Sequence, residues 1–158
     1  MHLRLAVTTD AGAVAQLFHD AIRALSAGDY SSEQIEAWAG VPEAARWRDR
    51  IADQSHEFWT AELDEALVGF CEFEPDGYVD TLYVSPDHAR RGVATALLRQ
   101  VHESAARLGL ARLYTEASIT ARPVFEKQGF RVIEPQDVTI RGTALRNYQM
   151  EKNLQPEG

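Results

Sequence analysis

Two arginines and a glycine stand directly before a predicted helix, in the stretch 89–95, which runs Ala-Arg-Arg-Gly-Val-Ala-Thr. The first N–H groups of a helix lack intrahelical partners and carry a partial positive charge, so they attract phosphate. Gly92 and the small Ala94 let the backbone approach an anion closely, while Arg90 and Arg91 add positive charge. The stretch therefore predicts a phosphate-binding loop, and an ordinary solvated helix cap is the alternative.

Other motifs for phosphate, metal or nucleophilic chemistry are not matched. No Gly-Lys-Ser or Gly-Lys-Thr sequence follows the loop, and the three-glycine pattern of dinucleotide-binding folds is missing. The five histidines are scattered and the one cysteine is Cys71, so no ligand spacing predicts a metal site. Cys71 lies in the apolar run 68–71, which favours a buried structural thiol over a nucleophile.

The charge of the chain limits its partners. It has 24 Asp and Glu against 16 Lys and Arg, a formal net charge of −8, so it should repel phosphate backbones and anionic lipid. We therefore expect no nucleic-acid and no membrane partner. No apolar run approaches the ~20 residues of a membrane span, and no signal-peptide pattern begins the chain. A single cysteine, which allows no intrachain disulfide, is typical of a cytoplasmic protein.

Hydrophobic periodicity predicts the elements that must position the loop. Alternation predicts a first strand at 3–7, and residues 8–10 supply N-cap chemistry for a helix that Gly28 ends. Ser32 caps a short second helix, and Pro42 stands where a third helix begins. The period then becomes strand-like and predicts three strands with hairpin connections, at 58–63, 67–73 and 79–84.

Helices and strands alternate in the second half of the chain. A long amphipathic helix over 93–108 ends at Gly109, and a strand follows at 111–117. Pro123 occupies the first turn of a short helix that Gly129 closes. The remaining alternation predicts three further strands, at 130–133, 138–140 and 145–150.

The order of these elements predicts an α/β fold. One strand, three helices and three strands are followed by a helix, a strand, a helix and the last strands, and a mixed sheet with helices on both faces buries all their apolar stripes. The chain has 158 residues, of which 45% are hydrophobic and 25% charged, as in ordinary globular domains. We expect one compact domain over 1–154 and a frayed tail over 155–158.

Three segments together resemble the GCN5-related N-acetyltransferase (GNAT) superfamily. The segment 86–98 contains the family's loop, Gln/Arg-x-x-Gly-x-Gly/Ala, at 89–94; the strand 113–117 follows; and 121–130 ends like the family's Tyr-Glu-Lys-x-Gly-Phe. The resemblance extends from residue 3 to residue 150 and implies a mostly antiparallel mixed sheet. Within the superfamily, the sequence more closely resembles a bacterial branch that includes YafP-type proteins. This closer resemblance does not indicate which acceptor is used.

The resemblance implies that acetyl-CoA is the co-substrate and that no metal is needed. In this family the loop cradles the pyrophosphate, and the strand before it pairs by its backbone with the pantetheine arm. The residues implied to bind the cofactor are Leu82, Tyr83, Val84, Arg90, Arg91, Gly92, Val93, Ala94, Thr95, Ser118, Arg122 and Phe125.

The sequence departs from the family at three of its motif positions. Ala89 replaces the usual Gln or Arg, which should weaken binding little because backbone donors do most of the cradling. Ser118 stands where many members have Asn, and Phe125 stands where many have a Tyr that protonates the leaving thiolate. Phe125 has no proton to donate, so the acid lies elsewhere or the thiolate leaves unaided.

Acetyl transfer to an amine needs a base for the amine and a stabilised tetrahedral oxyanion. Glu72, Asp80 and Glu116 lie on strands near the implied cofactor, and each is either a base or a solvated strand charge. Asp80 is two residues before Leu82, which predicts that the two share a face of their strand. Tyr148 is our candidate for the acid, with two alternatives, Tyr83 and Tyr114.

The acceptor predicted from the resemblance is a primary amine of a small molecule. Substrate specificity in GNAT proteins usually comes from the segment after the first helix, here 28–38, in which Tyr30 and Trp38 are candidates for the wall of an acceptor pocket. The rivals are an acyl-CoA sensor without turnover and acetylation of a protein or an aminoacyl-tRNA, the last disfavoured by the charge of −8. The resemblance also makes a homodimer possible.

Overall fold

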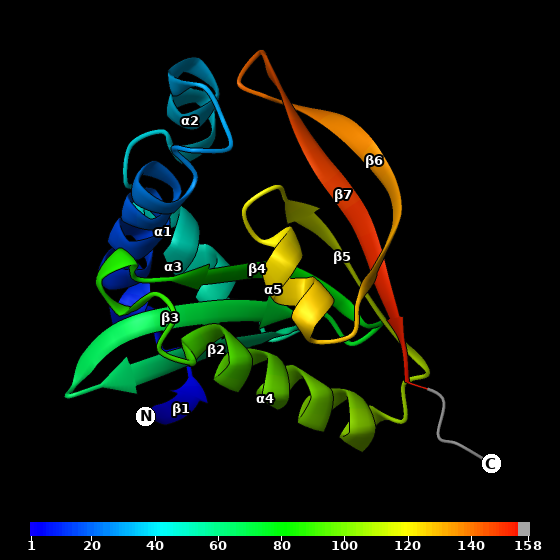
Figure 1. Ribbon diagram of the computed structural model, residues 1–158. Coiled ribbons are helices and arrows are strands. Elements are labelled where there is room, and N and C mark those ends of the chain that lie inside the picture. Colours follow the sequence, from blue (N-terminus) through cyan, green and yellow to red (C-terminus); the bar gives the residue numbers. More distant parts are fainter. Residues whose placement is uncertain (155–158) are drawn as a thin grey trace.

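A seven-stranded sheet forms the centre of the computed structural model, which describes residues 1–154; the predicted frayed tail at 155–158 lies outside the described residues. Its spatial order is β1-β2-β3-β4-β5-β7-β6 (Figure 1). Every neighbouring pair is antiparallel except β4 and β5, which confirms the mixed, mostly antiparallel sheet. The strands are β1 (His2–Leu5), β2 (Glu57–Leu63), β3 (Ala66–Phe73), β4 (Tyr78–Val84), β5 (Arg112–Ser118), β6 (Arg131–Ile140) and β7 (Thr143–Asn153).

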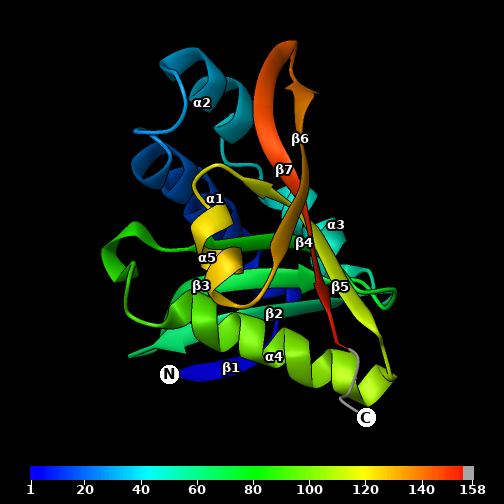
Figure 2. The same cartoon turned by 45° about the vertical axis from the view of Figure 1, so that its right-hand side comes forward.

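Helices cover both faces of this sheet, as the sequence predicts (Figure 2). On one face lie α1 (Ala11–Leu25), α2 (Ser32–Ala39) and α3 (Ala44–Ala52). On the other lie α4 (Val93–Leu108) and α5 (Arg122–Lys127). Within residues 1–154, no helix combines the length and the apolar character that a bilayer crossing requires.

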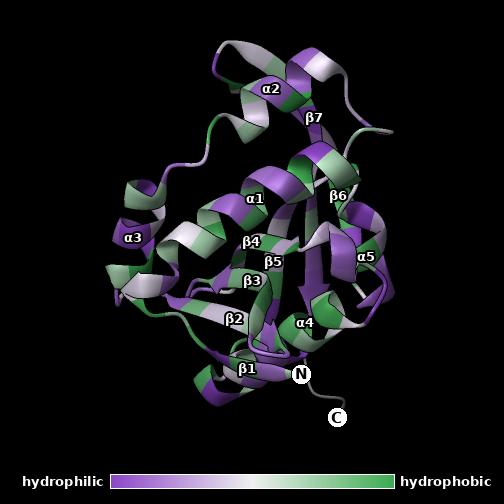
Figure 3. Cartoon of the chain, turned by 90° about the vertical axis from the view of Figure 1, so that its left-hand side faces the viewer, coloured by the Kyte–Doolittle hydropathy of each residue, from purple (hydrophilic) through white to green (hydrophobic). Residues whose placement is uncertain are grey.

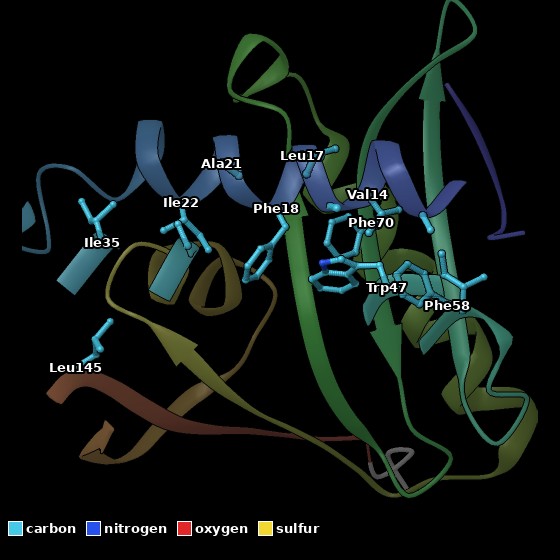
Figure 4. Close-up of a cluster of buried hydrophobic side chains, with 14 of the residues drawn as sticks. Val14, Leu17, Phe18, Ala21, Ile22, Ile35, Trp47, Phe58, Phe70 and Leu145 are labelled. Atoms are coloured by element: carbon cyan, nitrogen blue, oxygen red, sulfur yellow. The ribbon is translucent and has the colours of Figure 1, made fainter. Parts of the chain in front are cut away.

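Alternation along the strands divides the core into two clusters. Phe70 and Cys71 are neighbours on β3, yet Phe70 packs under α1 and α3 while Cys71 packs under α4, because successive side chains point to opposite faces. Figure 3 views the molecule from the side of α1, where hydrophilic and hydrophobic residues alternate along the helix. Figure 4 shows Trp47 of α3, 1% exposed, between the aromatic rings of Phe18, Phe58 and Phe70.

Several predicted boundaries are wrong. The first strand ends at Leu5 and not at residue 7, and the N-cap of α2 is Ser31 and not Ser32. The segment predicted as two strands, 130–133 and 138–140, is the single strand β6, which continues through Pro135. Pro135 is tolerated because β6 is an edge strand, where one side of the backbone needs no partner. The first helix ends at Leu25 with Ser26 as its C-cap, before Gly28. Gly28 is not among the glycines with positive φ, so it does not form a left-handed stop.

The parallel strands β4 and β5 pair only briefly. Their register contains two pairs, Tyr78 with Tyr114 and Val79 with Thr115. Beyond these pairs β4 continues toward the loop before α4, whereas β5 stays paired with β7 up to Ser118. Figure 1 shows the two strands diverging from this short contact. The sheet is therefore split at its centre.

Gly77 lies at the closed end of the split, where β4 and β5 are still paired. Its carbonyl accepts a hydrogen bond from the N–H of Tyr114 at 3.0 Å, its φ is +108°, and a Cβ there would lie 2.4 Å from the carbonyl oxygen of Arg112. We expect Gly77→Ala to lower the free energy of unfolding by about 2–4 kcal/mol, because backbone strain and a backbone clash add. Urea unfolding measures the loss.

Gly28→Ala is the matched control. Gly28 has no positive φ, and no atom lies within 4 Å of its Cβ position, so this change should leave stability equal or slightly higher. Equal unfolding midpoints for the two variants would contradict the role of Gly77.

Candidate active site

The predicted phosphate-binding loop connects β4 to α4. Gly92 is the N-cap of α4 and is left-handed, with φ +82° and ψ 8°. No atom lies within 4 Å of a Cβ placed there, so the backbone conformation and not crowding requires the glycine. Arg90 is also left-handed, with φ +64°. Two left-handed residues turn the chain so that α4 begins with its N–H groups directed back toward the loop.

A groove extends from this loop across the end of β4 to α5, and we call it the long groove. Its volume is about 530 Å³. Most of the predicted cofactor residues line it: Leu82, Tyr83, Val84, Arg90, Gly92, Val93, Ala94, Thr95 and Ser118. Ala21, Ile22 and Leu25 of α1, together with Lys127 of α5, also line it and were not predicted. The apolar periodicity of α1 predicts buried residues, but it does not distinguish the wall of a groove from the core.

Three predicted cofactor residues do not line the long groove. Arg91 lies outside all three cavities described here, and the guanidinium of Arg122 lies 4.7 Å from the centre of the Tyr148 ring. Phe125 is 3% exposed, packs edge-on against Phe130 and lines the next cavity instead. The predicted loop therefore lines the long groove, whereas Arg91, Arg122 and Phe125 do not.

The split between β4 and β5 contains a second space, the central cavity, of about 130 Å³. Residues 80–83 of β4 and 115–118 of β5 face each other across it, and Phe125 closes one side. It shares lining residues with the long groove, namely Trp38, Leu82, Tyr83, Ser118 and Ala121. The two spaces therefore adjoin each other at the parted strands and share part of their walls.

A third space lies on the α1–α3 side, and we call it the arginine cavity. It measures about 530 Å³ and is lined by Phe18, Trp38, Arg46, Arg50, Asp80, Thr81, Tyr83, Ile140 and Arg141. Trp38, Asp80, Thr81, Tyr83 and Ile140 also line the central cavity. The three spaces thus adjoin one another in series, from the predicted phosphate-binding loop past the split sheet to the arginines.

Glu72 is held by other side chains and lines none of the three cavities. It is 1% exposed, and its carboxylate accepts hydrogen bonds from Arg50 Nε at 2.8 Å and from Thr81 Oγ1 at 2.9 Å. His56 Nε2 lies 3.2 Å from Oε1 of the same carboxylate. Of the three predicted carboxylates, Glu72 is therefore the one that the structure separates from these spaces.

Asp80 reaches the central and arginine cavities because of a β-bulge. The register between β3 and β4 shifts so that Glu72 faces Thr81 and Phe73 faces Val79, which leaves Asp80 as the extra residue. The prediction that Asp80 shares the face of Leu82 is therefore wrong. Leu82 packs on the α4 side, whereas Asp80 accepts a hydrogen bond from Arg50 Nη2 of α3 at 3.0 Å.

Burial raises the pKa of Asp80 above its ordinary value, and the charge of Glu72 raises it further, while Arg50 opposes both effects. The side chain remains 35% exposed, in the wall shared by the central and arginine cavities. Glu116 of β5 also lines the central cavity. The structure thus brings Asp80 and Glu116 to the two sides of the split.

The tyrosines differ in their placement. Tyr148 lines none of the three cavities, because Leu145 and Asn147 of β7 face the central cavity and alternation turns Tyr148 toward α5. Tyr114 bonds Asp76 near the closed end of the split. Tyr83 lines all three cavities, and burial raises the pKa of its phenol. The prediction of Tyr148 near the cleft is not supported by this placement.

Both predicted substrate residues face the cavities. Tyr30 lines the central cavity, but its hydroxyl is engaged: it donates to the carbonyl of Arg146 at 2.6 Å and accepts from the N–H of Ile119 at 2.9 Å. Trp38 lines all three spaces and packs edge-on against Tyr30, with ring centres 5.4 Å apart. Cys71 is fully buried, and burial raises the pKa of its thiol, as expected of a structural cysteine.

Comparisons with known proteins agree with this geometry. A sequence model of the acetyltransferase (GNAT) domain matches residues 26–154. The N-acetyltransferase YafP of Escherichia coli K12 is 37% identical over 134 residues, which cover 85% of this chain and 83% of that protein. The chain belongs to the GNAT acetyltransferase family. It is an N-acetyltransferase, as its sequence motifs predict.

Solved GNAT structures share the fold over nearly the whole chain. A GCN5-related N-acetyltransferase from Rhodopseudomonas palustris is 35% identical and superposes with a TM-score of 0.90, covering 97% of this chain and 95% of its own. The PaiA N-acetyltransferase of Thermoplasma acidophilum, solved with coenzyme A, is 20% identical with a TM-score of 0.79, covering 96% and 98%. The split sheet described above is thus part of a GNAT fold.

The buried pair beneath the GNAT cleft should be essential for stability. Removing Arg50 leaves the carboxylate of Glu72 buried without its cation, so Arg50→Met should lower the free energy of unfolding by about 3–5 kcal/mol. Adding Glu72→Met to that variant should recover part of the loss, because the buried carboxylate that lost its cation is then gone as well. Guanidinium unfolding measures both.

Arg48→Met provides the control on the same helix, since Arg48 is exposed. It should change stability by less than about 0.5 kcal/mol. If Arg50→Met cost no more than Arg48→Met, the ion pair would not be important for stability.

Proposed function

We propose that this protein binds acetyl-CoA in the long groove and transfers its acetyl group to a primary amine of a small molecule. The observation that carries the proposal is the succession of three adjoining spaces at the parted strands. The predicted phosphate-binding loop lies at one end, a small cavity with carboxylates lies in the middle, and the arginine cavity, the proposed acceptor space, lies beyond. An acceptor amine then reaches a thioester placed in the split from the opposite face of the sheet.

The backbone of β4 supplies donors along the cofactor. N–H groups along a strand alternate between its two sides, and the N–H of Ser85 donates to the Val68 carbonyl of β3 at 2.8 Å. The N–H groups of Leu82 and Val84 consequently face the side from which β5 has diverged. There they are free to pair with the pantetheine arm and, at the thioester, to stabilise the oxyanion.

Asp80 is the proposed base. The acceptor nitrogen must lose a proton as it attacks the thioester carbon, and a carboxylate accepts that proton directly or through one water. The new C–N bond forms, the tetrahedral oxyanion collapses, the C–S bond breaks and the thiolate of CoA leaves. A carboxylate whose pKa is raised by burial holds a proton more strongly than an exposed aspartate.

Tyr83 is better placed than Tyr148 to protonate the thiolate. Tyr83 lines the central cavity, and its phenol, whose pKa is raised by burial, is protonated at neutral pH. A CoA thiol with a pKa of ~8.5 is itself mostly protonated at that pH, so a donor helps the collapse of the intermediate. Phe125, at the position where the family often has its donor, contributes only apolar contact.

Calorimetry of acetyl-CoA binding tests the groove. Gly92→Glu places a carboxylate at the N-terminus of α4, where it repels the pyrophosphate, so the affinity should fall about ten-fold or more. Gly109→Glu is the matched control, because Gly109 caps the opposite end of the same helix, is also left-handed and also has no atom within 4 Å of its Cβ position. Equal affinities for the two variants would refute the proposed cofactor site.

Steady-state kinetics test the base. Asp80→Asn should lower kcat about 100-fold or more with little change in acetyl-CoA affinity, whereas Glu116→Gln should have a smaller effect. The base works only when deprotonated, so activity falls as the pH falls through its pKa. Because the pKa of Asp80 is raised from 3.8, the acid limb of wild-type kcat/KM should lie above pH 3.8.

This acid limb should disappear in Asp80→Asn. An unchanged limb in that variant would assign the base to another group.

A further inference from the structure

The arginine cavity concentrates positive charge in an acidic protein. Arg46 and Arg50 of α3 and Arg141 of the β6–β7 turn line it, opposed by the single carboxylate of Asp80, although the chain has a formal net charge of −8. Like charges that converge in a partly buried space repel one another. Arg46 and Arg141 are exposed, so solvent screens part of this repulsion, and a bound anion would relieve the rest.

Only one of these arginines is neutralised by the protein. Arg50 pairs with Glu72 beneath the cavity and with Asp80 in its wall. For Arg46 and Arg141, no carboxylate of the described residues lies within 4.0 Å of the guanidinium. Burial lowers the pKa of Arg46, and repulsion by Arg50 and Arg141 lowers it further, while the carboxylate of Glu43 opposes these effects. An anion bound between them would relieve this repulsion.

Local contacts hold Arg46 and Arg141 in place. The guanidinium of Arg46 lies 5.5 Å from the ring centre of Phe18 and 5.1 Å from that of Trp47. Arg141 Nη1 donates to the carbonyl of Ala37 at 2.6 Å, in the last turn of α2, where carbonyls lack helical partners. The two side chains are therefore held by rings and backbone, and their remaining N–H donors are available to a ligand.

The absence of a side chain at Gly40 leaves room for the guanidinium of Arg141. A Cβ at Gly40 would lie 2.8 Å from both Nη1 and Nη2 of Arg141, so a larger residue would displace the guanidinium. Gly40 is itself left-handed, with φ +57°, and it terminates α2. Arg141 has φ +46°, a conformation that costs a residue with a side chain about 1–2 kcal/mol.

The rest of the cavity favours a small organic anion. Phe18, Trp38, Tyr83 and Ile140 form apolar walls, and a low-dielectric wall strengthens the attraction between a guanidinium and an oxyanion. Asp80 and Tyr83 are shared with the central cavity, so a ligand whose anion meets Arg46 and Arg141 extends inward toward Asp80. The charges therefore orient a molecule with an anion at one end and an amine at the other.

We infer that the acceptor is a small primary amine that carries an oxyanion, of the kind found in amino acids and aminophosphonates. Arg46 and Arg141 bind the oxyanion, and the amino group faces Asp80. Guanidinium groups bind carboxylate and phosphonate oxygens in the same forked geometry, so the shared feature is the oxyanion. The inference rests on the proposed acetyl transfer and adds the class of its acceptor.

The test compares matched acceptors by release of the CoA thiol. The probes are proteinogenic amino acids, the primary carboxamide of each, and aminomethylphosphonate and 2-aminoethylphosphonate. For the best pair, kcat/KM of wild type should be at least about ten-fold higher for the acid than for its amide, mainly through KM. The phosphonates show whether a tetrahedral oxyanion is accepted as well.

Arg46→Gln should reduce the acid-over-amide ratio about ten-fold. Arg48→Gln, two residues further along α3 and outside the lining of the arginine cavity, should retain the wild-type ratio. Acetyl-CoA affinity, measured by calorimetry, should be the same in both variants, which separates acceptor recognition from misfolding.

The outcomes separate this inference from the proposed function. Equal turnover of acids and amides, or a ratio that Arg46→Gln leaves unchanged, would overturn the oxyanion site while acetyl transfer to amines stands. Thiol release with the amides but not with the acids would also overturn the oxyanion site while acetyl transfer to amines stands. No thiol release with any amine of the panel would overturn both the acceptor class and the small-molecule activity.

Discussion

The two-residue pairing of β4 with β5 is the constraint on which the rest of the structure depends. Parallel strands that stayed paired would close the sheet, and the phosphate-binding loop on one face would then be separated from the arginines on the other. Because β5 leaves β4 after Thr115 and follows β7, the backbone donors of Leu82 and Val84 lose a strand neighbour and become available to a ligand. One interruption of the ladder thus creates both the split and the groups that line it.

A second irregularity, the bulge at Asp80, decides on which side of the split the proposed base lies. In a regular strand Asp80 would point with Leu82 toward α4, away from the acceptor. The extra residue turns it toward Arg50, which also binds the buried Glu72. Glu72 therefore affects the site indirectly: it fixes the guanidinium that contacts Asp80, and its charge helps to raise the pKa of that carboxyl.

Local patterns in the sequence predicted the parts of this structure that local forces determine. The helix over 93–108, its stop at Gly109 and the phosphate-binding loop follow from capping and periodicity, and the family motif gave the activity. The bulge changes the face of Asp80 through the register with β3, which periodicity within one strand does not contain. The arginine cavity combines Arg46 with Arg141, residues far apart in the sequence that only the packing of α2 against the β6–β7 turn brings to one cavity.

The charges along these spaces also bear on the protonation of the acceptor. A primary amine is mostly an ammonium ion at neutral pH, and the attacking nitrogen must first lose that extra proton. Cations nearby disfavour the charged form and lower the pKa of such an amine, while the carboxylate of Asp80 favours the charged form and attracts it. Arg46 and Arg141 therefore have two effects in the proposed complex: they bind the oxyanion and they oppose the ammonium. In that complex Asp80 opposes the arginines, because its carboxylate stabilises the ammonium that it is proposed to deprotonate.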